Sequence, residues 1–165
     1  MTVANKTQIK QTWNLEKVQE EAVSAMTRNC GVVQNVLSQL GQEAQKKYQQ
    51  AVVQMKVEHF RKLNVKTPIE LVKAMAEFEV NVFGSRVVVW GDEKQASMEY
   101  EYCACYNAMQ KNASACATTG GKNMEEMAKC FQESTQLIAK EFGFTKGEVK
   151  FPTNPEEHAV ITFTK

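Results

Sequence analysis

The strongest constraint on the fold of this chain is a change in the spacing of its apolar residues at Gly84. Before this glycine, apolar residues recur every three or four positions, which is typical of amphipathic helices. After it, the residues from Gln95 to Tyr106 alternate between two sets of side chains, which is typical of a strand with one buried face. We therefore expect a helical part over residues 1–84 and a strand-containing part over residues 85–165.

The helical part has recognisable starts and stops. Asn14 is suited to cap a helix that begins at Leu15. Gly31 is expected to bend or break this helix, and Gly41 is expected to end it. A second helix is expected to carry an apolar stripe that comprises Ala44, Tyr48, Ala51, Val52, Met55 and His59.

The third helix has the clearest start in the chain. Thr67 and Glu70 form a capping box around Pro68 at the first helical position, which predicts a helix over residues 68–83 that Gly84 closes. Its apolar face is expected to consist of Leu71, Met75, Phe78 and Val82.

Two hairpins are expected in the second part of the chain. Arg86–Trp90 is short and β-branched, which predicts a buried strand, and Gly91–Lys94 supplies a turn into the strand from Gln95 to Tyr106. The second hairpin is expected from Glu148–Phe151 and His158–Thr164.

Helices are expected between these hairpins. Asn107–Ser114 is suited to a short helix, and a longer helix is expected from a cap at Asn123 to a stop at Gly143. The longer helix is expected to bury Met124, Met127, Phe131, Ile138 and Phe142.

This order of elements predicts an α+β fold, in which N-terminal helices pack with an antiparallel sheet of two hairpins separated by a helix. Short turns between neighbouring strands favour antiparallel pairing, because parallel strands need long crossover connections. No stretch of low complexity divides the two parts. We therefore expect residues 1–165 to form a single domain.

Composition and missing motifs exclude several classes of protein. The 20 basic and 19 acidic residues give a net charge of +1, which argues against a dedicated nucleic-acid-binding protein. The sequence has no run of apolar residues long enough to span a membrane and no apolar signal-peptide core, so a cytoplasmic protein without a membrane partner is expected. It contains no GxGxxG, Walker, HExxH, GxSxG or CxxC motif. With two histidines and five cysteines, the candidate reactive groups are free thiols and carboxylates.

Cys103 and Cys105 are the first candidate site. Two residues apart on a strand, they would project from the same face. Their thiolates would suit zinc or another soft ion, with Cys116 or Cys130 as further ligands. The alternative is that both are small buried side chains, because free cysteines are often buried.

Cys130 and Glu133 are the second candidate site, since residues three apart on a helix are neighbours. A carboxylate can accept a proton during hydrolysis, whereas a thiolate needs a lowered pKa to be a nucleophile. A nearby carboxylate raises a thiol pKa, so this pair would need a cation or a metal. The alternative is a core cysteine beside a solvated glutamate.

Several further polar residues have two interpretations. Glu79 lies beside the apolar stripe of its helix, where it would be either a half-buried carboxylate facing the thiols or a solvated one. Glu99 and Glu101 need partners if helices cover their face of the strand. His59 and His158 are isolated in the sequence and are expected to be ordinary surface or core residues.

Residues 85–165 resemble the L-2-amino-thiazoline-4-carboxylic acid hydrolase-like family, and they are also similar to four-vinyl-reductase type ligand-binding domains. The resemblance rests on a strand ending in Cys103, a glycine-containing loop, a helix bearing Cys130 and Glu133, and a closing hairpin. The family usually has Asp where Glu133 stands, and a further Cys where this chain has the run from His158 to Ile161.

The resemblance implies a hydrolase that opens an amidine-type ring C–N bond. Cys130 would be the nucleophile or a metal ligand, Glu133 would handle the proton, and Cys103 would line the site. The alternative is a noncatalytic small-ligand or metal-binding module, with Cys103, Cys105 and Cys130 around the metal. A third hypothesis is a partner-binding protein that uses its N-terminal helices, with a homodimer as one form.

Overall fold

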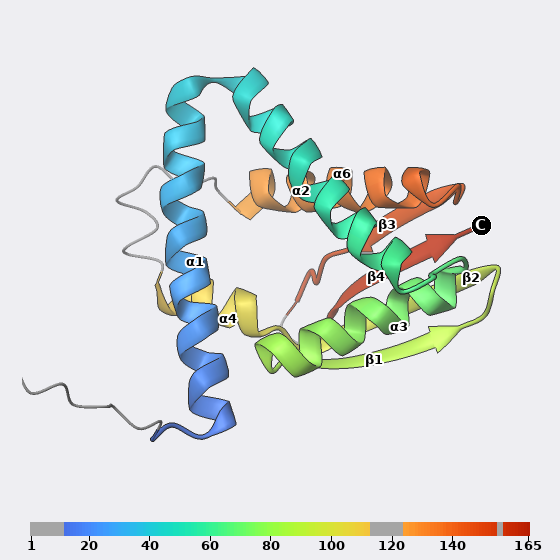
Figure 1. Cartoon of the computed structure of the whole chain (residues 1–165), viewed down its shortest axis with the longest axis horizontal. Helices are drawn as coiled ribbons and strands as arrows, with labels where there is room; N and C mark the ends of the chain where they lie inside the picture. The colour runs from blue at the N-terminus through green and yellow to red at the C-terminus, as the bar shows by residue number, and fades with distance from the viewer. Residues whose placement is uncertain (1–11, 113–123, 155–156) are drawn as a thin grey trace, which may run out of the picture.

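A computed structural model describes residues 12–112, 124–154 and 157–165 and shows an α+β fold (Figure 1). The described residues contain one four-stranded sheet, which is antiparallel throughout and has the strand order β1-β2-β4-β3. Two hairpins, β1–β2 and β3–β4, are separated by helices, as predicted. The elements are α1 (Leu15–Leu40), α2 (Gln42–Lys62), α3 (Pro68–Phe78), the π-helical turn η1 (Glu79–Phe83), β1 (Arg86–Gly91), β2 (Gln95–Tyr102), α4 (Ala104–Lys111), α6 (Met124–Glu141), β3 (Lys146–Lys150) and β4 (Ala159–Thr164).

Helices cover one face of the sheet and leave the other face open. In Figure 1, α3 runs along the β1–β2 hairpin and α6 runs beside β3. The main core joins these helices and α2 to the inward side chains of β2 and β4, among them Met98, Ile161 and Phe163. On the other face, Val88 and Trp90 of β1 are each 45% exposed. The prediction that β1 is a buried strand is therefore wrong, because β1 is an edge strand with one solvated face.

Helix α1 lies at the side of the molecule and packs on α4, α2 and η1 (Figure 1). A small second core joins its Val23 to Ala104 and Ala108 of α4. The expected bend at Gly31 is wrong, because α1 continues as one helix through this residue to Leu40. None of the helices in the described part of the chain is long and apolar enough to cross a membrane.

The apolar stripe expected for α2 is also wrong. Val53, Val57 and Phe60 are the buried residues of this helix, whereas Tyr48 and Met55 are exposed. The buried face lies one position away from the predicted one, because the choice among neighbouring apolar residues depends on how the helix packs on α6 and into the main core.

The capping box of α3 is confirmed. The Thr67 hydroxyl accepts a hydrogen bond from the backbone N–H of Glu70 at 3.4 Å, and the Glu70 carboxylate accepts one from the N–H of Thr67 at 3.0 Å. Beyond Phe78 the helix widens into η1, which ends at Gly84 with a φ of +73°. This φ lies in the left-handed region that glycine adopts most readily.

The buried face of α3 differs from the predicted one. Phe78 and Val82, predicted to be buried, are 43% and 44% exposed. Glu79 lies three positions after the buried Ala76 and seven after the buried Val72, so it continues the inner face of the helix and is half-buried.

The strand prediction for Gln95 to Tyr106 is correct only as far as Tyr102. The thiol of Cys103 caps α4 by accepting a hydrogen bond from the N–H of Tyr106 at 3.4 Å. The alternating sequence pattern continues to Tyr106, but the residues after Cys103 are helical. The short helix predicted to begin at Asn107 therefore begins at Ala104. The predicted cap Asn123 and the candidate ligand Cys116 lie outside the described residues.

Candidate functional site

A carboxyl–thiol cluster, formed by Glu79, Ser85, Tyr100, Cys103 and Cys105, is the strongest candidate site. It brings together η1, the connection from η1 to β1, the end of β2 and the start of α4. Glu79, Cys103 and Cys105 are each half-buried, and Ser85 and Tyr100 are buried. The three half-buried members therefore remain accessible from solvent at the edge of the two cores.

Glu79 is the only carboxyl group of the cluster, and two hydroxyl groups approach it. The Ser85 hydroxyl donates a hydrogen bond to its Oε2 at 3.0 Å, and the Tyr100 hydroxyl lies within hydrogen-bonding reach. Burial raises the pKa of Glu79, and these hydroxyl groups and the charge of Lys56 oppose that rise. Among the described residues, no lysine, arginine or histidine forms an ion pair with this carboxylate.

Ser85 connects the carboxyl group to the helix that carries the thiols. Its hydroxyl accepts a hydrogen bond from the backbone N–H of Ala104 at 3.2 Å while it donates to Glu79. Its own N–H donates to the carbonyl of Glu79 at 3.1 Å. The position of Glu79 is therefore fixed by the start of α4 as well as by η1.

The two thiols of the cluster are poor nucleophiles at neutral pH. Burial, followed by the carboxylate of Glu79, raises the pKa of Cys105 to about 12. Burial and the same carboxylate also raise the pKa of Cys103, although the N–H of Tyr106 opposes the rise. Because a thiolate is the reactive form of cysteine, both thiols are weakly reactive.

The predicted catalytic group of Cys103, Cys130 and Glu133 is divided between two places. Cys103 belongs to the cluster, whereas Cys130 and Glu133 lie on α6. The backbone carbonyl of Cys130 accepts a hydrogen bond from Gln49 of α2 at 3.1 Å. Cys130 is half-buried and Glu133 is exposed, which matches the alternative of a core cysteine beside a solvated glutamate.

The metal set of Cys103, Cys105 and Cys130 is not formed in the described part of the chain. No three histidine, cysteine, aspartate or glutamate side chains among residues 12–112, 124–154 and 157–165 are arranged to hold a metal ion. The set depended on Cys105 lying on the strand face of Cys103, but Cys105 lies in the first turn of α4. All four cysteines in these ranges, Cys30, Cys103, Cys105 and Cys130, are free thiols, as expected.

One polar pair was not predicted from the sequence. On the open face of the sheet, Nδ1 of His158 lies 2.8 Å from Oε1 of Glu99. These residues are 59 positions apart, and only the pairing of β2 with β4 brings them together. No local signal in the sequence could have identified this pair, which lies among exposed side chains.

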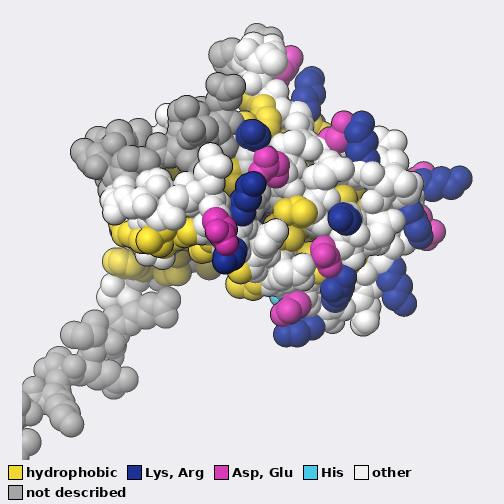
Figure 2. Space-filling view, turned by 90° about the horizontal axis from the view of Figure 1, so that it is seen from above, with side chains coloured by type: hydrophobic (Ala, Val, Ile, Leu, Met, Phe, Trp, Pro, Cys, Tyr) yellow, Lys and Arg dark blue, Asp and Glu magenta, His cyan; other side chains and the backbone are white. Residues whose placement is uncertain are grey.

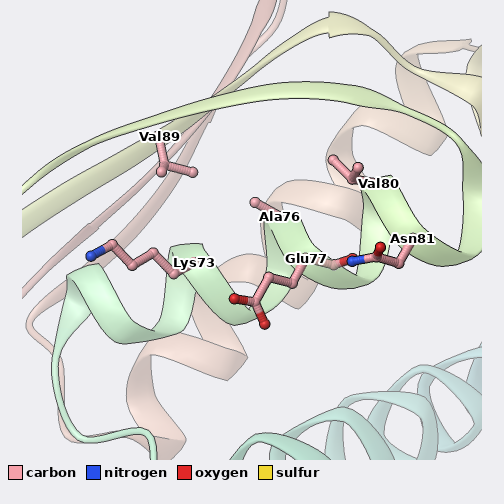
Figure 3. A pocket seen from close by; sticks show the side chains of 6 residues that line it. All are labelled: Lys73, Ala76, Glu77, Val80, Asn81 and Val89. Atoms are coloured by element: carbon pink, nitrogen blue, oxygen red, sulfur yellow. The ribbon is translucent and has the colours of Figure 1, made fainter.

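A shallow groove of about 290 Å³ lies between α3, η1 and the edge strand β1, and no member of the carboxyl–thiol cluster lines it. Figure 3 shows Ala76 and Val80 on the helical side of the groove, pointing toward the strand that carries Val89, with Lys73, Glu77 and Asn81 along the same helix. Ligand pockets usually occupy roughly 300–1,000 Å³ and enclose most of the ligand. The groove is therefore smaller and more open than a typical ligand pocket, and it includes none of the predicted site residues.

Comparisons with protein-family models, with curated proteins and with solved structures found no match to this chain.

Proposed function

We propose that this protein is a noncatalytic small-ligand-binding module, and that its ligand carries an amidinium or ammonium group that pairs with Glu79. The observation that supports this proposal is the half-buried Glu79 carboxyl group, which has hydroxyl neighbours but no ion-pair partner among the described residues. A buried carboxylate is costly unless a cation or strong hydrogen bonds compensate for its lost hydration. A cationic ligand would supply that missing partner.

An amidinium group suits this carboxyl group particularly well. Planar, cationic N–H donors bind a carboxylate through two parallel hydrogen bonds. The family resembled by residues 85–165 acts on an amidine-type ring, which supports the same chemical class. Tyr100 and Ser85 would hold the carboxylate in place while the cation approaches from the solvent-accessible side.

The hydrolase hypothesis receives no comparable support from the geometry. A nucleophilic thiol needs a lowered pKa, but the pKa values of Cys103 and Cys105 are raised. Cys130 lies on α6 and makes no hydrogen bond to either of these cysteines in the described part of the chain. Ring hydrolysis by Cys130 and Glu133 is therefore the competing hypothesis, and an assay of turnover distinguishes it from ligand binding.

The test measures thermal unfolding of the full chain with benzamidine and with its neutral analogue benzamide. We expect benzamidine, but not benzamide, to raise Tm, and Glu79→Gln to abolish the effect. The matched control is Glu133→Gln, which removes an exposed carboxylate and should leave the shift intact. Binding should strengthen as pH rises through the raised pKa of Glu79, since the cation prefers the ionised carboxylate.

Two outcomes would overturn the proposal. One is an absent benzamidine shift, or a shift that persists in Glu79→Gln. The other is turnover of 2-amino-thiazoline-4-carboxylate, followed by chromatography, that disappears in Cys130→Ala. The second outcome would establish the hydrolase instead.

A further inference from the structure

The outer face of α1 carries a heptad pattern in which six of the eight a and d residues are apolar. Counting Leu15 as the first position of a heptad, the a positions are Leu15, Ala22, Asn29 and Val36, and the d positions are Val18, Ala25, Val32 and Gln39. All eight side chains are exposed, with Leu15 at 70%, Val32 at 52% and Val36 at 50%. A repeat of apolar a and d positions over several heptads is typical of helices that pair with another helix.

The contacts of α1 with the rest of the fold do not use this stripe. Val23 and Thr27 are its buried residues, and Gln19 donates a hydrogen bond to the carbonyl of Asn81 at 2.9 Å. These residues lie on the opposite side of the helix from the stripe. Figure 2 keeps the left-to-right position of Figure 1, and it shows a band of hydrophobic side chains at the left, where Figure 1 places α1.

We infer that this stripe is a self-association surface, on which α1 of a second copy of the chain packs in the antiparallel direction. Centred between Ala22 and Ala25, the pairing places Ala22 of one copy against Ala25 of the other. The next layers place Val18 against Asn29 and Leu15 against Val32. The small alanines allow the two helices to approach closely at the symmetry axis, and the paired segment from Leu15 to Val32 spans about 27 Å.

Charge distribution selects this arrangement. Glu21 and Arg28 occupy g positions, and g positions of antiparallel neighbours lie beside each other, so symmetry creates two Glu21–Arg28 pairs. In a parallel pair each g position would face an e position, where this helix has Met26 and Val33. Two-fold pairing of identical patches is also the commonest form of homo-oligomer.

The same charges argue against a lipid surface as the occupant. Helices that lie on membranes are rich in lysine and arginine on their polar face. Helix α1 has three acidic residues, Glu16, Glu20 and Glu21, against the two basic residues Lys17 and Arg28. A Lys-poor, net acidic helix would not be drawn to an anionic bilayer.

The first experiment is sedimentation equilibrium of the full chain and its Val32→Glu variant. We expect the natural chain to be dimeric and Val32→Glu to be monomeric with an unchanged far-UV circular dichroism spectrum, because Val32 is exposed in the single chain. The Tm of this variant should fall, since the dimer no longer stabilises the folded state. Met55→Glu is the matched control, since Met55 is an exposed apolar residue of α2 outside the stripe, and it should remain dimeric. A monomeric natural chain, a dimer unaffected by Val32→Glu, or a Val32→Glu monomer that has lost helical signal would overturn the inference.

A charge-reversal cycle tests the direction of pairing. Glu21→Arg and Arg28→Glu should each weaken the dimer by about tenfold in Kd, which corresponds to about 1.4 kcal/mol. The double variant restores opposite charges and should recover most of the affinity. If the double variant is as weak as the two changes combined, the antiparallel arrangement is wrong.

Discussion

Replacing Glu79 with glutamine tests the central physical claim about the carboxyl–thiol cluster, which is that burial of Glu79 opposes its ionisation. The substitution preserves the size of the side chain and leaves an oxygen to accept the hydrogen bond from Ser85. It removes the titrating proton. The variant should therefore differ from the natural chain in the pH dependence of its free energy of unfolding.

The sign follows from the raised pKa. Below the ordinary pKa near 4.5, the carboxyl group is protonated in both the folded and the unfolded chain. As pH rises, the unfolded chain loses the proton first, so the folded state loses stability until pH passes the folded pKa. Over that interval the free energy of unfolding of the natural chain should fall relative to Glu79→Gln by about 1.4 kcal/mol per pH unit. Above it the difference should be constant.

Urea unfolding of both chains between about pH 4 and pH 8 measures this difference. A constant offset of about 1 kcal/mol is expected from the altered hydrogen bonds and carries no information on ionisation. Glu133→Gln is the control, and its difference from the natural chain should not vary with pH, since Glu133 is exposed. A difference curve for Glu79→Gln that is flat, or that rises in favour of the natural chain, would refute the burial argument.

Three further substitutions or reactions test the packing and the thiols. Leu71→Ala should lower the free energy of unfolding by about 2–5 kcal/mol in urea, because Leu71 is fully buried, whereas Leu63→Ala at an exposed site should cost less than about 0.5 kcal/mol. Gly147→Ala should cost about 1–3 kcal/mol, because its Cβ would lie 2.5 Å from the Thr135 carbonyl oxygen and would force β3 away from α6; an unchanged Tm would contradict this close approach. Iodoacetamide at pH 8 should label the exposed Cys30 before Cys105, whose pKa is about 12, and peptide mapping that finds the reverse order would contradict the cluster geometry.

The parts of the fold that the sequence predicts correctly are those encoded by local chemistry. The capping box at Thr67 and Glu70, the stop at Gly41 and the turn at Asp92 each depend on residues within a few positions of each other. The strict alternation along β2 identifies its inward face, including Met98 and Tyr100. These features are sufficient to predict an antiparallel sheet with N-terminal helices.

The errors arise where tertiary contacts decide between local alternatives. In α2 several neighbouring positions are apolar, and only packing on α6 and in the main core selects Val53 and Val57 for burial. At Cys103 the strand pattern of small and large residues continues, but the hydrogen bond from Tyr106 to the thiol begins a helix instead. Alternation of residue types therefore did not determine where β2 ends.

The candidate site was predicted in its elements but not in its organisation. Glu79 and the thiols were each singled out, yet Cys130 and Glu133 were expected to join them. Glu79 continues the inner face of α3 after Val72 and Ala76, and Ser85 links it to the start of α4, whereas Cys130 and Glu133 lie on α6. The hydrogen bond from Ala104 to Ser85 joins residues 19 positions apart, so no local pattern in the sequence predicts it.

Ser85 explains why the π-helical turn and the thiols belong to one site. Its hydroxyl joins Glu79 of η1 to the first N–H of α4, and its backbone N–H binds the carbonyl of the same glutamate. If Glu79 moves toward a ligand, it must either lose its hydrogen bond to Ser85 or move Ser85, which accepts a hydrogen bond from Ala104 at the start of α4. Cys103 and Cys105 lie on either side of Ala104, so the thiols belong to the same site.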